Sequence, residues 1–135
     1  MPNAASLSSQ IRVARPTDQL DAVRRFYCEG LGLKELGGFS GHAGYDGVFI
    51  GLPGSEVHLE FTSHAGGSPG AAPSRDNLLV LYVGTEAARD QVAAQLAGIG
   101  VSPVEPENPY WAGVGALTFE DPDGWRVVLV PAEGP

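Results

Sequence analysis

Apolar and polar positions along the chain form short periodic segments, and each predicts an element of secondary structure. Residues 11–16 alternate with the period of a half-buried strand. Over residues 20–31 apolar side chains recur at three- and four-residue steps, which predicts an amphipathic helix capped by Thr17 or Asp18 and stopped by Gly30 and Gly32. Three more strands are expected after it, at residues 34–39, 48–52 and 57–62.

The same order of elements then returns in the second half of the chain. A strand is predicted at residues 78–83, and Thr85 begins a helix whose apolar positions include Val92 and Leu96. Three further strands follow, at residues 101–104, 116–119 and 125–130. We therefore expect a tandem βαβββ repeat. Its parts are an N-terminal tail at 1–10, a first unit at 11–62, a Gly/Pro/Ser linker at 63–76 and a second unit at 77–131.

Composition narrows the possible partners and locations. Eight Lys and Arg residues against sixteen Asp and Glu give a net charge of −8, which disfavours binding to nucleic acids and anionic membranes. No apolar run reaches the length of a membrane span, and the first ten residues lack the pattern of a secretory signal. Cys28 is the one cysteine, so an internal disulfide is excluded. These observations predict a soluble, cytoplasmic protein.

Particular segments of this repeat resemble the vicinal oxygen chelate superfamily. The segments are residues 12–23, Phe26-Tyr27, residues 30–33 (GLGL) and the turn at residues 120–125 (EDPDGW). This superfamily includes glyoxalase I, bleomycin-resistance proteins and extradiol dioxygenases. The resemblance implies an α+β fold in which the two units form a curled sheet around a central cleft. It also implies a homodimer, in which each chain forms its own cleft or the units are exchanged between chains.

The resemblance also implies four positions for metal ligands, on matching strands of the two units. These positions hold Arg12 and Glu60 in the first unit and Leu78 and Val128 in the second. Only Glu60 is a ligand type, and a guanidinium repels a cation, so we expect no metal and no cofactor. We hypothesise that Arg12 and Glu60 form a buried ion pair where the metal would lie. The alternative is that Arg12 reaches solvent and Glu60 is an ordinary carboxylate at a sheet edge.

His58 lies two residues before Glu60, so strand alternation places both side chains on one face. The apolar residues between them are expected to face the helix, which turns His58 and Glu60 toward the cleft. There His58 can act as a general base or as a hydrogen-bond donor. A partly buried histidine satisfied by a neighbouring group is the other interpretation.

Five further residues are candidates for contact with a ligand. Tyr110 and Trp111 lie in a loop where aromatic rings can stack on a ligand, although a dimer contact or a plug over the core explains them equally. Tyr45 is expected at the rim of the cleft and Tyr82 on its wall. Arg126 shares a face with residue 128 and can hold an anion, or it is a surface charge.

These features favour a protein that binds a small organic ligand in the cleft between its units without the metal of the superfamily. The alternative is a lyase or isomerase of the glyoxalase type. In it Glu60 and His58 supply acid and base, and Arg12 stabilises a developing negative charge. A dimeric module without a ligand is a third possibility, because a fold does not determine a function.

Overall fold

The computed structural model describes residues 10–68 and 70–135, which form two successive units of strands and helices. The first unit contains β1 (Ile11–Pro16), α1 (Leu20–Arg24), η2 (Arg25–Gly30), β2 (Lys34–His42), β3 (Tyr45–Gly51) and β4 (Val57–His64). The second contains β5 (Leu78–Tyr82), α2 (Glu86–Gly98), α3 (Tyr110–Gly113), β6 (Leu117–Glu120) and β7 (Arg126–Val130). Among the described residues no helix is long and apolar enough to span a membrane.

Each unit forms its own sheet, and the order β5-β7-β6 in the second sheet matches the order β1-β4-β3 in the first. In the first the strand order is β1-β4-β3-β2, with β1 parallel to β4 and the other pairs antiparallel. In the second the order is β5-β7-β6, with β5 parallel to β7. The predicted α+β class and the tandem repeat are confirmed.

The predicted strand at residues 101–104 is wrong. Val104 forms a single bridge to Thr118 on β6, at the place where a fourth strand of the second sheet would lie. Pro103 and Pro106 flank this bridge and lack the backbone N–H groups that a longer ladder requires. The second sheet therefore ends in one bridge instead of a strand.

The first helix begins at Leu20 as predicted, but neither Thr17 nor Asp18 is its N-cap. Its N-cap is Gln19, without a side-chain cap. The Thr17 hydroxyl instead accepts a hydrogen bond from the Gln19 N–H, and the Asp18 carboxylate accepts one from the N–H of Ser68 in the connecting segment. In the second unit Thr85 caps α2 as predicted and accepts a bond from Ala88.

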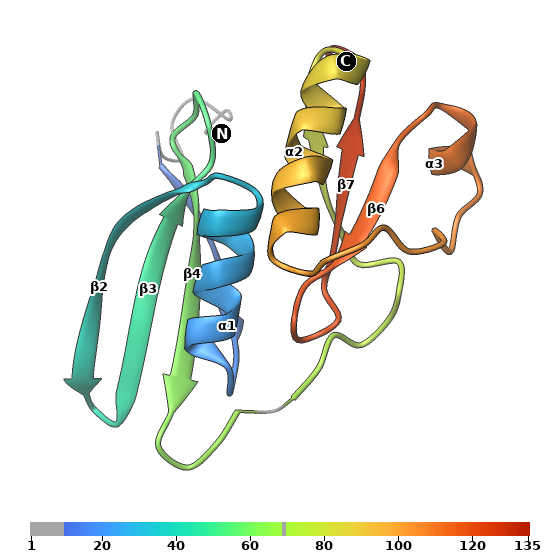
Figure 1. Ribbon diagram of the computed structural model, residues 1–135. Helices are drawn as coiled ribbons and strands as arrows, with labels where there is room; N and C mark the ends of the chain where they lie inside the picture. The colour runs from blue at the N-terminus through green and yellow to red at the C-terminus, as the bar shows by residue number, and fades with distance from the viewer. Residues whose placement is uncertain (1–9, 69) are drawn as a thin grey trace, which may run out of the picture.

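The helices lie between the two sheets, as Figure 1 shows for α1 and α2. Residue Gly30 of η2 approaches α2 so closely that a Cβ there would lie 2.6 Å from Cδ2 of Leu96. One core draws on both units. It contains Val23, Phe26, Tyr27, Leu31, Leu33, Val48, Ile50, Leu59, Phe61, Leu96, Phe119, Val127 and Leu129. Each sheet therefore packs one face on the shared core and turns the other face outward.

A buried hydrogen bond ties the units together at the turn between β6 and β7. The Tyr27 hydroxyl donates to Oδ2 of Asp121 at 2.7 Å, and Oδ1 of Asp121 accepts from the backbone N–H groups of Asp123 and Trp125. Burial is the main reason that the pKa of Asp121 is raised, and it also raises the pKa of Tyr27 well above its usual value. Trp125 is only partly buried, and Arg15 stacks on its ring.

Candidate ligand-binding site

The outward face of the first sheet carries three polar side chains that sequence analysis singled out. Leu59 and Phe61 of β4 point into the core, so the alternating residues His58 and Glu60 point outward. Arg12 lies on the neighbouring strand β1, where its Cα is paired with that of His58. We call this surface, made by Arg12, Phe49, His58 and Glu60, the outer wall.

Arg12 contacts the other three residues of the outer wall. Its Nε donates to Nε2 of His58 at 2.9 Å, and its Nη1 lies 3.5 Å from Oε2 of Glu60. Its guanidinium carbon lies 4.6 Å from the centre of the Phe49 ring, close enough for a cation–π contact. Three contacts of different kinds thus hold the guanidinium in one place.

The ion pair between Arg12 and Glu60 is more exposed than the buried pair that we hypothesised from the sequence. The side chain of Arg12 is 48% exposed and that of Glu60 is 15% exposed. Arg12 and Glu60 therefore pair as hypothesised, but the arginine is half in solvent and the pair is not buried. Solvent screening makes such a pair weak as a source of stability. Its half-exposed guanidinium remains able to donate hydrogen bonds to an incoming ligand.

The hydrogen bond from Arg12 fixes the tautomer that a neutral His58 adopts. A guanidinium can only donate, so Nε2 of His58 must accept, and a neutral imidazole then carries its proton on Nδ1. In this state His58 presents an N–H donor from Nδ1 and has no free lone pair. The Phe49 ring meets the imidazole edge-on, with 6.2 Å between ring centres.

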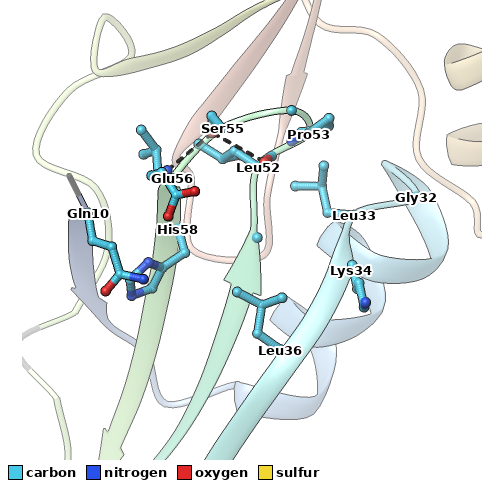
Figure 2. Close-up of a pocket in the computed structure, with 13 residues that line it drawn as sticks. Gln10, Gly32, Leu33, Lys34, Leu36, Leu52, Pro53, Ser55, Glu56 and His58 are labelled. Carbon is cyan, nitrogen blue, oxygen red and sulfur yellow. Dashed lines mark hydrogen bonds between the residues drawn. The ribbon is translucent and has the colours of Figure 1, made fainter.

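A hollow of about 360 Å³ adjoins the outer wall at His58 (Figure 2). The turn between β3 and β4 forms one side of it, and Leu36 at the start of β2 forms another. The hydroxyl of Ser55 holds this turn by donating to the carbonyl of Leu52 and accepting from the N–H of Val57. His58 thus belongs both to the outer wall and to the lining of this hollow.

The donor set does not fit the metal that the superfamily resemblance implies. Among the described residues no group of three His, Cys, Asp or Glu side chains can hold a metal ion. On the outer wall the one nitrogen of His58 that has a lone pair already accepts from Arg12. The matching positions of the second unit, Leu78 and Val128, offer no donor atoms.

The structure places the other candidate residues away from the outer wall. The ring of Tyr45 contacts that of His64 at the far end of β3 and β4, with 4.4 Å between ring centres and a tilt of 57°. Tyr82 is exposed at the end of β5, and Tyr110 and Trp111 form the short helix α3 beside β6, where a loop was expected. These residues do not form one site with Arg12 in a single chain.

Arg126 is neither a free anion-binding group nor a surface charge. Its side chain is almost fully buried, and its Nη2 and Nε donate to Oε2 of Glu120 at 2.7 and 3.1 Å. Its Nη1 donates to the carbonyl oxygen of Glu105. Arg126 therefore ties β7 to β6 and to the segment that precedes α3.

Phe49 is the member of the outer wall that sequence analysis missed. Val48 and Ile50 on either side of it are buried in the core, so the alternation of β3 already turned Phe49 to the opposite face. That signal was present in the sequence. The contacts of Phe49 with Arg12 and His58 could not be predicted from the sequence, because they depend on how three strands align.

Comparison with known proteins identifies the family. The model of a YycE-like N-terminal domain matches residues 11–62, and that of a YycE-like C-terminal domain matches residues 76–131. A protein of Bacillus subtilis, "Uncharacterized protein YycE", is 51% identical over 127 residues, which cover 94% of this chain and 91% of that protein. The chain belongs to the YycE-like family.

Solved structures place this family in the superfamily that the sequence resembles. A crystal structure of a YycE protein from Bacillus subtilis matches with a TM-score of 0.91 and 48% identity, covering 100% of this chain and 98% of that one. A glyoxylase/bleomycin resistance protein/dioxygenase domain from Frankia sp. EAN1pec matches with a TM-score of 0.71 and 25% identity, covering 95% and 100%. The resemblance to the vicinal oxygen chelate superfamily is thereby confirmed.

Proposed function

We propose that this YycE-like protein binds a small organic molecule on the outer wall without a divalent metal. The observation that carries the proposal is the position of the Arg12 guanidinium, which lies between His58 and Glu60 and over Phe49. In this arrangement a fixed positive charge stands where the superfamily resemblance implies a cation. A ligand oxygen can accept hydrogen bonds from the guanidinium, whereas at a metal site it would donate a lone pair to the ion.

The surroundings of Arg12 favour a ligand that combines an apolar body with an oxygen acceptor. Phe49 supplies an aromatic surface, and the hollow beside His58 is lined partly by Leu33 and Leu36. Arg12 and the Nδ1–H of His58 are donors, whereas Glu60 is an acceptor. Few, convergent polar groups on an apolar surface are typical of small-molecule sites.

Thermal-shift screening of a metabolite and antibiotic library tests the proposal. We expect compounds that stabilise the wild-type protein and bind at least tenfold more weakly to Arg12→Gln and Phe49→Leu. Arg25→Gln is the matched control, because Arg25 pairs with Glu29 on the exposed side of η2. Stoichiometric zinc, nickel or iron in the purified protein, lost in Glu60→Gln, would refute the metal-free site.

A catalytic role of the lyase or isomerase type is the second candidate, favoured by the mostly buried carboxylate of Glu60 beside a guanidinium. In this role Glu60 accepts a proton from the substrate, and Arg12 stabilises the negative charge that develops. His58 donates a hydrogen bond to the substrate from its Nδ1–H. Product formation by the wild type that is abolished in Glu60→Gln supports this role. If a compound binds to both the wild type and Glu60→Gln, and neither protein converts it to a product, the result supports sequestration of the compound.

A further inference from the structure

The outward face of the first sheet contains a second hollow, beyond the outer wall. It measures about 340 Å³. Its lining combines small, hydroxyl-bearing and ring side chains, among them Ala14, Tyr45, Thr62, His64 and Ser68. Thr62 and His64 follow Glu60 at steps of two along β4, so they share its outward side of the sheet. This second hollow therefore lies on the same face as the hollow beside His58, which we call the first hollow.

The outer wall lies between the two hollows. His58 lines the first hollow, and its Cα is paired with that of Arg12. Ala14 lines the second hollow, and its Cα is paired with that of Glu60. From His58 to Thr62 the strand rises by about 13 Å, at roughly 3.3 Å per residue. Arg12 and Glu60 therefore stand on one strip of the sheet with a hollow on either side of them.

The first hollow has a largely apolar lining. Leu36 of β2 and His58 of β4 both line it, and Gly51 of the strand between them has its Cα paired with that of His58 (Figure 2). A Cβ at Gly51 would lie 3.3 Å from the methyl carbons of Leu36, so the missing side chain keeps this part of the hollow open. The two charged residues of the lining, Lys34 and Glu56, have opposite signs. Its apolar lining consists of Leu33, Leu36, Leu52, Pro53 and Val57. The first hollow therefore suits an apolar group.

Two rings form one side of the second hollow. The ring of Tyr45, whose side chain belongs to a residue that is 43% exposed, lies against that of His64. Nδ1 of His64 accepts a hydrogen bond from the N–H of Gly66 at 3.0 Å. A neutral imidazole at this position therefore carries its proton on Nε2 and can donate from there. The two rings offer a hydroxyl and an N–H beside an aromatic surface.

Hydroxyl groups complete the second hollow. Thr62 and Ser68 both line it, and Oγ of Ser68 is buried without a hydrogen-bond partner among the residues that the structure describes. Arg15 also contributes to the lining, but its guanidinium lies over the ring of Trp125 in the second unit. Hydroxyls both donate and accept hydrogen bonds, so the second hollow suits a neutral group that carries several hydroxyls.

We propose that the ligand of this protein is an elongated molecule that spans both hollows. Its apolar end lies in the first hollow, an oxygen acceptor lies at Arg12, and a hydroxyl-bearing ring lies beside Tyr45 in the second. Tyr45 and Arg12 are separate contacts that only such a ligand joins. The inference rests on the proposed function, because it takes Arg12 as the polar anchor. Each hollow alone is at the small end of the range for ligand pockets, about 300–1,000 Å³, whereas both together accommodate a drug-sized molecule.

Three carboxylates that share the same anchoring group test the two ends separately. Octanoate offers an apolar chain, methyl β-D-glucuronide offers a hydroxylated ring, and octyl β-D-glucuronide offers both. In isothermal titration calorimetry below the critical micelle concentration, we expect octyl β-D-glucuronide to bind at least about tenfold more tightly than either of the other two, because it links two binding groups in one molecule. Equal affinities for octyl β-D-glucuronide and octanoate would overturn the proposal, since the second hollow would then be unused.

Substitutions at the two ends give the decisive pattern. We expect Tyr45→Ala to weaken binding of both glucuronides and to leave octanoate unchanged. Leu36→Ser should weaken octanoate and octyl β-D-glucuronide and leave methyl β-D-glucuronide unchanged, whereas Arg12→Gln should weaken all three. Val114→Ala is the matched control, because Val114 is 40% exposed, much like Tyr45, and lies at the end of α3. Equal losses for all three probes in Tyr45→Ala would refute the assignment of the second hollow to the hydroxylated ring.

Compounds from the thermal-shift screen distinguish failure of this inference from failure of the proposed function. Compounds that lose affinity in both Arg12→Gln and Tyr45→Ala support a ligand that spans the two hollows. Compounds that lose affinity in Arg12→Gln alone refute the elongated ligand and leave binding on the outer wall in place. Compounds that bind equally well to Arg12→Gln refute the proposed function, and this inference with it.

Discussion

Tyr27→Phe removes one hydroxyl at the contact between the two units and leaves the packing of the ring unchanged. The ring still lies 4.8 Å from those of Phe26 and Phe61, but Oδ2 of Asp121 loses the hydrogen bond that it accepts at 2.7 Å. Hydrogen bonds to charged groups contribute about 1.5–3 kcal/mol, and a buried oxygen without a partner keeps its desolvation cost. We expect the free energy of unfolding to fall by about 2–3 kcal/mol.

Urea unfolding followed by tryptophan fluorescence measures this loss. For a domain of this size each kcal/mol lowers Tm by roughly 3–4 °C, so calorimetry gives an independent reading. Tyr110→Phe is the control, since the Tyr110 side chain is exposed and its hydroxyl has no such role. A loss below about 0.5 kcal/mol for Tyr27→Phe would show that the hydrogen bond does not hold the units together.

Four further substitutions have expected outcomes. Burial raises the pKa of Asp121. Its contribution to the free energy of unfolding is therefore complete below the pKa that it has in the unfolded chain, and is lost as the pH rises through its pKa in the folded protein. The stability difference between wild type and Asp121→Asn should therefore shrink from pH 4 upward in urea titrations, and a difference that grows would contradict the burial argument. Gly30→Ala should destabilise by about 1–3 kcal/mol through overpacking on Leu96, whereas Gly98→Ala, with open space around it, should stabilise slightly. Thr85→Ala should cost about 1 kcal/mol of unfolding free energy, because α2 loses its N-cap.

Features that depend on neighbours in sequence were predictable. The alternation of residues 57–62 placed His58 and Glu60 on the face opposite Leu59 and Phe61, as the structure has them. The apolar positions of the helix predicted over residues 20–31 include Val23 and Tyr27, and both are buried. These patterns are local, since side-chain direction in a strand or helix follows from backbone geometry alone.

Features that depend on the alignment of distant segments were not predictable. The pairing of Arg12 with both His58 and Glu60 requires a particular register between β1 and β4. Arg126 is buried because the backbone carbonyl of Glu105 and the side chain of Glu120 reach it, and no spacing in the sequence reveals that. Likewise, a repeat of elements does not show which faces of the two units meet.

The shared core has a consequence for how the duplicated chain unfolds. Although the sequence contains two similar units, the side chains of each fill the interior of the other, with Leu96 of α2 packed directly on η2. Neither unit has a complete interior of its own, so the whole chain should lose its structure in a single cooperative transition. Repetition in the sequence thus gives one folding unit, and a fragment cut within the linker would lack the part of the interior that the other unit supplies.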